Sequence, residues 1–378
     1  MNTRRILLVV LGVVSTGAIG SYIWPRYAAV SNIINARTRR ASDSANPATK
    51  TEAKANGGTK NPAAADEGGS VAVERYSAQI RELLLQDKFD DLEAIVSELR
   101  ATKARFVGGA WKLHKFYYGL DSPVQGQKAT DEDWLSLLEK LREWIRLRPE
   151  STTARVALGQ ALTQYAWYAR GSGFSDTVGQ DGWRLFRERL ALAQRVLEEA
   201  ARLRTKCPHW YAAMQWVGIG QGWDAGRFDK LFKRAVAVEP MYHYFYFNKA
   251  QFLLPRWHGR EGEWEEFADE TYDTAGGKNG SILYYLIGLE LARYYRGKAF
   301  FSESKVSWPR MKQGFADLEE AYGANNEQLN EMSRFAGWAG DRAGSRELFE
   351  RIGDNWDSHT WGEKKYFDEF KAWASCVQ

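Results

Sequence analysis

Residues 130–149, TDEDWLSLLEKLREWIRLRP, combine the local signals of an amphipathic helix in one stretch. Apolar residues recur at spacings of three and four, which places them on one face of a helix with 3.6 residues per turn. Thr130 and the three acids after it form a helix start, because a side-chain oxygen caps free N–H groups and acids favour the positive end of the helix dipole. Pro149 follows the last basic residues and ends the helix.

The same helical pattern continues through nearly all of the chain after residue 70. Further helix starts are indicated by the capping-box spacing of Asn325 with Gln328 and of Thr360 with Glu363. About fourteen helices of roughly 10–20 residues fit between the proline and glycine breakers. Residues 242–247, YHYFYF, resemble a strand, but they lead directly into NKAQFLLP, so a buried aromatic helix is predicted there.

Many short helices with short connections predict helix pairs stacked as an α-solenoid. Residues 226–240, GRFDKLFKRAVAVEP, resemble the second helix of a tetratricopeptide repeat in their aromatic, small and proline positions. Residues 89–99 and 340–352 look like weaker copies, and first-helix positions are not recognisable. The predicted fold class is therefore all-α, a tetratricopeptide-like solenoid with degenerate repeats over residues 71–378.

The first residues differ sharply from this domain. Residues 1–5 are short and basic, and residues 6–24, ILLVVLGVVSTGAIGSYIW, contain no charge. A helix of this length, rising about 1.5 Å per residue, just crosses a hydrocarbon core of about 30 Å. We predict an uncleaved transmembrane anchor; the alternative is a cleaved signal peptide, although bulky Tyr22 and Trp24 make a poor cleavage site.

Residues 25–70 connect this span to the domain. The segment 41–70 contains no Val, Ile, Leu, Met or aromatic residue, so it cannot bury enough apolar surface to fold and is predicted to be a disordered linker. We expect a single-pass protein of a bacterial inner membrane. Arginines are nearly balanced across the span and leave the side of the domain open, while the short N-terminal tail favours the periplasmic side.

The formal net charge of +4 is unevenly distributed along the chain. Lys and Arg outnumber Asp and Glu by nine to four in residues 1–70, whereas the remaining chain holds 43 bases and 44 acids. A nearly neutral domain lacks the cationic surface that phosphate backbones require, so we expect no nucleic-acid partner.

Three longer strings carry a family resemblance. They are YAWYARGSGFSDTV at 165–178, CPHWYAAMQWVGIGQGWDAGRFDKLFKRAVAVEP at 207–240 and FLLPRWHGREGEWEEFA at 252–268. Together they resemble a bacterial family known as a domain of unknown function, DUF4034, over roughly residues 75–375. The resemblance implies a tetratricopeptide-like helical fold and no defined activity, so it assigns no catalytic residue.

Two constellations in these strings suggest sites. Trp167 and Arg170 lie on one helix face, where a guanidinium beside an indole could hold a carboxylate or phosphate; alternatively, Arg170 caps the helix end before two glycines. Arg256 and Trp257 precede four glutamates at 261–266, a group suited to ligand binding or acid–base work. The alternative is that these acids simply occupy the first turn of a helix.

The sequence gives little support for a metal or cofactor site. Cys207 and His209 form a C-P-H triplet, but a metal site needs three or four convergent ligands and no HExxH or paired CxxC occurs. The two cysteines, Cys207 and Cys376, could form one bridge that the sequence does not decide. We therefore predict no metal, no cofactor and no catalytic residue.

The sequence favours a membrane-tethered helical scaffold that binds a protein or peptide partner, with its oligomeric state open. The alternative is an envelope enzyme or glycan-binding protein with a cleft lined by aromatic rings and carboxylates. The 52 aromatic residues suit either a bulky core or such a groove. The candidate binding positions are Trp167, Arg170, Trp210, Tyr211, Trp223, Arg256 and Trp257.

Overall fold

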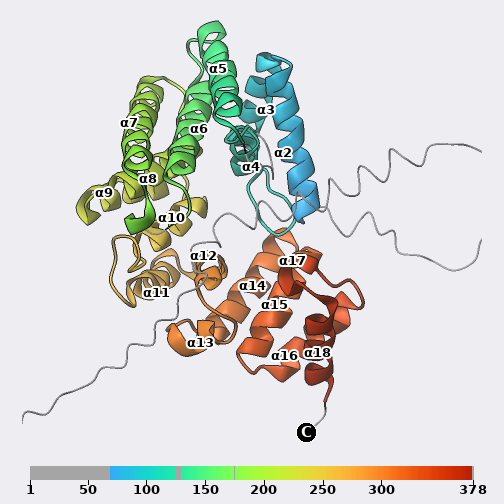
Figure 1. The fold of residues 1–378 in the computed structure, drawn as a ribbon. Helices are drawn as coiled ribbons and strands as arrows, with labels where there is room; N and C mark the ends of the chain where they lie inside the picture. The colour runs from blue at the N-terminus through green and yellow to red at the C-terminus, as the bar shows by residue number, and fades with distance from the viewer. Residues whose placement is uncertain (1–68, 124–128, 174, 377–378) are drawn as a thin grey trace, which may run out of the picture.

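The computed structural model describes residues 69–123, 129–173 and 175–376. Within these ranges the regular structure is helical, apart from one isolated bridge between Arg105 and Trp111, which confirms the all-α prediction (Figure 1). The described residues form seventeen α-helices, more than expected, because α4, α13 and α17 are only one or two turns long.

In chain order, the first nine helices are α2 (Ser70–Leu85), α3 (Phe89–Thr102), α4 (Lys112–Tyr118), α5 (Asp131–Leu147), α6 (Thr152–Arg170), α7 (Gln180–Arg202), α8 (Pro208–Gln221), α9 (Ala225–Val238) and α10 (Tyr244–Phe252). The others are α11 (Glu263–Ala275), α12 (Gly277–Leu291), α13 (Ala299–Glu303), α14 (Trp308–Tyr322), α15 (Asn326–Trp338), α16 (Arg342–Ile352), α17 (Ser358–Trp361) and α18 (Lys364–Ser375). Two 3₁₀ turns are η2 (Ser175–Thr177) and η3 (Ala292–Tyr294).

Helix α5 forms as its sequence predicts. Thr130 Oγ1 accepts a hydrogen bond from the Asp133 N–H (3.2 Å), and Asp133 Oδ2 accepts one from the Thr130 N–H (2.8 Å), which is a complete capping box. The apolar stripe faces the core. Its buried members are Trp134, Leu137, Leu138, Leu141 and Trp144.

Two of the other local predictions are confirmed and one is wrong. Asn325 and Gln328 form the capping box of α15, and the aromatic segment at 242–247 leads into helix α10. Thr360 does not begin a helix with Glu363. Instead it lies inside α17, which Asp357 caps, because the Asp357 carboxylate accepts the Thr360 N–H at 2.6 Å.

The middle of the chain has two layers of helices. Helices α6, α8, α10 and α12 pack on one another in succession, and α7, α9 and α11 pack on their outer side (Figure 1). This order is that of an α-solenoid. We call the inner faces of α4, α6, α8 and α10 the inner wall, since His114 of α4 stacks against Tyr244 of α10 and lies 5.2 Å from His209 of α8, centroid to centroid.

The solenoid also contacts its own far end through residues 103–111, the closing loop. Gly108 N–H donates to the Tyr322 carbonyl (3.2 Å), and Gln328 Nε2 donates to the Gly108 carbonyl (3.0 Å). Gly108 has φ +85°, and a Cβ there would overlap the Gln328 side chain. Nearby, the Ser70 N–H at the start of α2 donates to Glu327 at the start of α15 (3.3 Å), so the first helix meets the late helices at its end (Figure 1).

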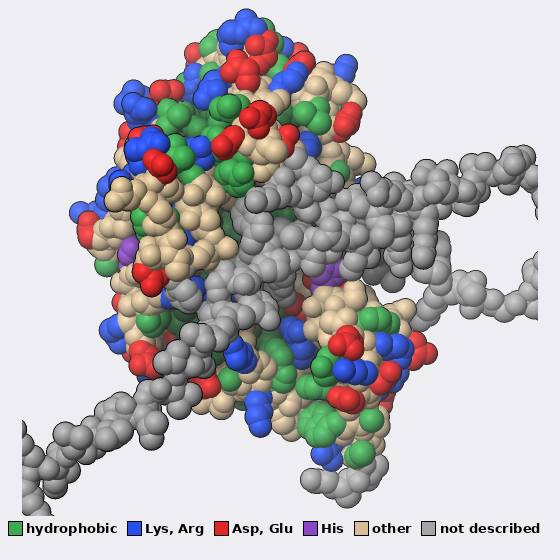
Figure 2. All heavy atoms as spheres, viewed as in Figure 1, with side chains coloured by type: hydrophobic (Ala, Val, Ile, Leu, Met, Phe, Trp, Pro, Cys, Tyr) green, Lys and Arg blue, Asp and Glu red, His purple; other side chains and the backbone are tan. Residues whose placement is uncertain are grey.

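Most of the aromatic side chains belong to the core. One large cluster of buried residues runs from α2 to α16, and a small second cluster joins α16, α17 and α18. Four tryptophans are almost completely buried, namely Trp111, Trp134, Trp144 and Trp264. On the face seen in Figure 2, acidic and basic side chains are interspersed over α5–α7 and α16–α18, as expected for a nearly neutral domain.

The predicted span at 6–24 and nearly all of the linker at 25–70 lie outside the described residues. Among the helices of the described ranges, none is both long enough and apolar enough to cross a membrane.

Candidate functional site

Helix α6 ends at Arg170 because Gly171 takes φ +74°, a backbone conformation that residues with a Cβ rarely adopt. Arg170 Nη1 donates to the carbonyls of Gly171 (3.1 Å) and Gly173 (3.0 Å), so the arginine does cap its own helix end. Its guanidinium carbon lies 5.6 Å from the Trp167 ring centre and 5.2 Å from that of Trp183, at the start of α7. The cation thus lies against two indoles.

The loop between α10 and α11 presents Arg256 and Trp257. The ring of the next residue, His258, is hydrogen-bonded through Nε2 to the carbonyl of Ile219 in α8 (3.0 Å). Gly259 allows the tight turn, because a Cβ there would overlap the Leu253 carbonyl. The loop is therefore fixed on the end of α8, near the end of α6.

The two segments meet through their tryptophans. The Trp167 and Trp257 rings form an edge-to-face pair with centroids 5.5 Å apart, and Trp216 of α8 lies 6.3 Å from Trp167. The Arg256 guanidinium carbon is 5.2 Å from the Tyr294 ring centre. We call this site the arginine cradle. Its members are Trp167, Arg170, Trp183, Trp257, Arg256 and Tyr294.

The arginine cradle has an excess of positive charge. The pKa of Arg170 is lowered, first by burial and then by the charge of Arg256. Among the described residues neither arginine forms an ion pair with a carboxylate. The indole N–H groups of Trp167 and Trp257 are also buried there without an acceptor. The site is rich in donors and positive charge.

Three of the predicted positions lie elsewhere. Trp210 donates its indole N–H to the Leu197 carbonyl of α7 (2.6 Å) and packs edge-to-face on Tyr211 (4.8 Å). Trp223 is 9% exposed, donates to Gln221 (2.8 Å) and carries Arg227 over its ring at 3.4 Å. All three pack between helices, and the structure does not bring them into the arginine cradle.

Three of the four glutamates that follow Trp257 make local contacts. Glu263 accepts the Arg260 N–H (2.8 Å), and Arg260 Nη2 donates to Glu266 (2.5 Å). Glu265 accepts the Tyr295 hydroxyl (3.3 Å), and burial raises its pKa. These acids occupy the first turn of α11, and none of them pairs with an arginine of the cradle.

A buried polar network beneath the inner wall has no counterpart in the predicted sites. Gln160 of α6 donates Nε2 to Asp121 (3.0 Å) and hydrogen-bonds His209 through Oε1, and His209 Nδ1 is bonded to the Tyr242 hydroxyl (2.8 Å). Burial raises the pKa of Asp121 to about 7 and lowers that of His209 to about 3. His209 is therefore neutral; because Gln160 Oε1 can only accept, it donates from Nε2.

Two cations lie close to this network. Arg81 of α2 is within electrostatic reach of Asp121, and two of its nitrogens are buried without a hydrogen-bond partner. Burial lowers the pKa of Lys115, whose neighbours include Asp121 and Glu74. The signal that sequence reasoning missed is Gln160, a polar residue that interrupts the apolar run VALGQAL.

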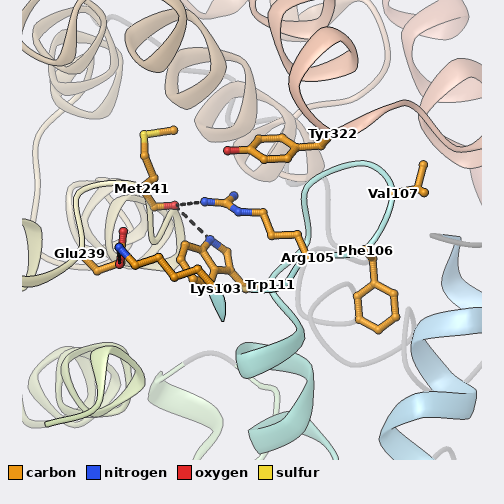
Figure 3. A pocket seen from close by; sticks show the side chains of 8 residues that line it. All are labelled: Lys103, Arg105, Phe106, Val107, Trp111, Glu239, Met241 and Tyr322. Carbon is orange, nitrogen blue, oxygen red and sulfur yellow. Dashed lines mark hydrogen bonds and ion pairs between the residues drawn. The ribbon is translucent and has the colours of Figure 1, made fainter. Parts of the chain in front are cut away.

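A hollow of about 580 Å³ lies beside the closing loop, and Figure 3 shows the residues that line it. Arg105 lies between the rings of Trp111 (4.1 Å) and Tyr322 (4.5 Å), and it donates to the carbonyls of Gly109 and Met241, each at 3.2 Å. Trp111 Nε1 donates to the same Met241 carbonyl (3.0 Å). The arginine has acceptors here, and the arrangement joins three parts of the chain.

The two cysteines are free thiols and do not form a bridge. Cys207 is buried, with its sulfur 3.3 Å from the Tyr117 hydroxyl, and Cys376 is exposed. In residues 69–123, 129–173 and 175–376, no group of three or more His, Cys, Asp or Glu side chains is arranged to hold a metal ion.

Comparison with known proteins gives one match. Residues 76–213 match the family model described as "Domain of unknown function (DUF4034)", which supports the resemblance found in the sequence. The matched segment contains Trp167 and Arg170 but ends before Arg256. No curated protein and no solved structure matches the chain.

Proposed function

We propose that the protein is a helical scaffold that binds an extended segment of a partner protein along its inner wall. The observation that carries this proposal is the convergence of Trp167 and Arg170, from the end of α6, with Arg256 and Trp257, from the loop after α10, on one donor-rich surface. Solenoids commonly bind extended peptides on such inner surfaces, where aromatic faces give contact area and polar groups fix the register.

The inner faces of α4 and α10 suit the same occupant. His114 stacks on Tyr244 with ring centres 3.4 Å apart, and His243 lies 4.9 Å from Phe247. His114 Nδ1 and His243 Nδ1 are buried without a hydrogen-bond partner. Buried polar atoms are normally paired, so these atoms, together with the flat aromatic faces, favour a peptide that supplies polar backbone groups.

In this proposal the helix pairs are degenerate tetratricopeptide-like repeats. The buried Ala235 of α9 lets a neighbouring helix approach, and Phe232 fills the adjacent space against Tyr246 (5.3 Å) and Phe267 (5.5 Å). The uncharged segment at 6–24 anchors the scaffold in a bacterial inner membrane, and the linker gives the domain reach beside it.

A photocrosslinking experiment on the full-length chain in cells tests the binding role. Phe247 on the inner wall is replaced by benzoylphenylalanine, and Tyr366 on α18, 44% exposed, receives the same probe as a matched control. We expect adducts at position 247 that map by mass spectrometry to one segment of one protein, and none of them at position 366.

A third variant confirms that the adducts depend on the wall. Trp216→Ala removes an indole that lies beside Trp167, so it should reduce the adduct formed at position 247. Identical adducts at positions 247 and 366, or no adduct at 247 in a chain that folds normally by circular dichroism, would overturn the proposal.

A further inference from the structure

The arginine cradle contains more donors than acceptors, because its one acceptor side chain, Tyr294, already bonds Arg293 and Gln251 through its hydroxyl. A guanidinium carries five N–H donors and no acceptor, and an indole carries one donor. Arg170 uses Nη1 on the loop carbonyls after α6, and no hydrogen bond to Arg256 is formed by the described residues. With the two orphan indole N–H groups of Trp167 and Trp257, the cradle needs a group made only of acceptors.

Other half-buried arginines of the fold differ from Arg170. Arg189 lies 3.8 Å from Asp131, and Arg310 lies 2.6 Å from Asp269. Both also lie over tyrosine rings, as the arginines of the cradle lie over aromatic rings. These two arginines thus have a carboxylate of the chain as their partner, and the arginine cradle lacks one.

The two cations also repel each other. Arg170 and Arg256 lie close enough for the charge of Arg256 to disfavour the charged form of Arg170, and the Trp167 and Trp183 indoles lie against Arg170. An anion between them would replace this repulsion with attraction, and a planar carboxylate matches the fork of a guanidinium.

The geometry points to a carboxylate site: the arginine cradle binds a carboxylate of the partner peptide, either an Asp or Glu side chain or its C-terminus. This inference rests on the proposed function and names the chemistry that the cradle recognises. A singly charged carboxylate fits better than a doubly charged phosphate, because the negative end of the α6 dipole lies at Arg170.

The experiment is an affinity selection with the full-length chain. The probe is a nonapeptide library of varied composition in three matched forms: with a free C-terminus, with an amidated C-terminus, and with a phosphoserine at one position. Bound peptides are identified by mass spectrometry. We expect enrichment of peptides that carry Asp, Glu or a free C-terminus over their Gln, Asn or amidated counterparts.

Variants locate the effect. Arg170→Gln with Arg256→Gln should weaken binding of a selected acidic peptide about tenfold or more, as expected when charge-assisted hydrogen bonds are lost. Arg256→Gln alone changes an exposed side chain, so its effect cannot come from unfolding. The matched control, Arg195→Gln with Arg202→Gln on exposed positions of α7, should bind as the unmodified chain does.

Each result separates the inference from the proposed function. If peptides are enriched without preference for carboxylates, or if the preference survives both cradle substitutions, the carboxylate site is wrong and the scaffold stands. Preference for phosphoserine over Asp and Glu overturns the carboxylate assignment. If no peptide is enriched by a folded chain, the proposed function fails and the inference fails with it.

Discussion

Two arginine–aromatic clusters of this molecule look alike but differ in the hydrogen-bond acceptors that the chain supplies to them. Arg105 lies between two aromatic rings and donates to two backbone carbonyls, one on the closing loop and one between α9 and α10. Arg170 lies against two indoles, but it donates only within its own helix end, and Arg256 nearby has no acceptor among the described residues.

This difference indicates what each cluster does. A buried donor without an acceptor costs free energy, so a chain that satisfies its arginine from three distant segments stabilises the contact among them. A chain that leaves the two indole N–H groups of Trp167 and Trp257 buried without an acceptor gains nothing from them in folding. The first cluster, Arg105 with Trp111 and Tyr322, holds three parts of the chain together, and we call it the joint. The second is a site at which a partner can supply the missing acceptors.

Removing each arginine in turn tests this difference most directly. Arg105→Ala loses two charge-assisted hydrogen bonds and two cation–π contacts, so it should lower the free energy of unfolding by about 3 kcal/mol. Arg256→Ala should lower it by less than about 0.5 kcal/mol, because its side chain is exposed. Urea unfolding followed by circular dichroism measures both.

Equal losses for the two variants would show that the distinction between joint and site is wrong. Arg105→Lys serves as the control for charge. A lysine keeps the positive charge but cannot donate to two carbonyls in the same fork, so it should recover only part of the loss.

The next test addresses the closing loop beside the joint. Gly108→Ala places a Cβ against Gln328 at φ +85° and should destabilise the fold by about 2 kcal/mol, from left-handed strain and overlap. Gly171→Ala at the cradle also has positive φ, but no atom lies within 4 Å of its Cβ, so it reports backbone strain alone. A larger loss for Gly171→Ala than for Gly108→Ala would contradict this account of the loop.

These predictions also show what the sequence could and could not reveal. The helix α5 and the capping box at Asn325 follow from residues within four positions of one another, so local patterns predict them. The closing loop joins Gly108 to Gln328 across 220 positions, and no local pattern specifies that contact. The failure at Thr360 is of a different kind, because Asp357 supplies a competing cap three residues earlier.

The candidate site was also predictable only in part. Trp167 with Arg170, and Arg256 with Trp257, stand out in the sequence as unusual short motifs, but their meeting depends on how α6, α8 and the loop after α10 stack. Trp210, although it belongs to an equally unusual string, packs between helices. The direction of a side chain on its helix decides between core and surface, and an aromatic residue suits both.

The buried network contains two titratable groups, Asp121 and His209, which are joined through Gln160 and whose pKa values shift in opposite directions. Asp121, with a pKa near 7, holds a proton in the folded state between about pH 4 and 7, so its contribution to stability falls as the pH rises. His209, with a pKa near 3, stays neutral when folded, so its contribution rises with pH between about 3 and 6.5. The two slopes oppose each other.

Asp121→Asn removes one of the two titrating groups, so the pH dependence of stability that comes from His209 should remain without its opposing contribution. Between pH 4.5 and 6.5, the unfolding free energy of the variant should rise more steeply with pH than that of the unmodified chain, by up to about 1.4 kcal/mol per pH unit. Asp176→Asn, at an exposed position, is the control and should leave the slope unchanged. An unchanged slope in Asp121→Asn means that Asp121 titrates normally in the folded chain.

The smallest effect separates two roles of Lys103 at the rim of the hollow. Its ammonium pairs with Glu239 at 2.7 Å, and its backbone has φ +53° at the end of α3, where glycine is preferred. Lys103→Ala loses the pair and keeps the strain, for a cost of about 0.5–1 kcal/mol, which added salt should reduce. Lys103→Gly loses the pair but relieves about 1 kcal/mol of strain, so it should match the unmodified chain in urea unfolding. If Lys103→Gly is as unstable as Lys103→Ala, the left-handed backbone at position 103 carries no strain that glycine relieves, and the loss in both variants comes from the ion pair with Glu239.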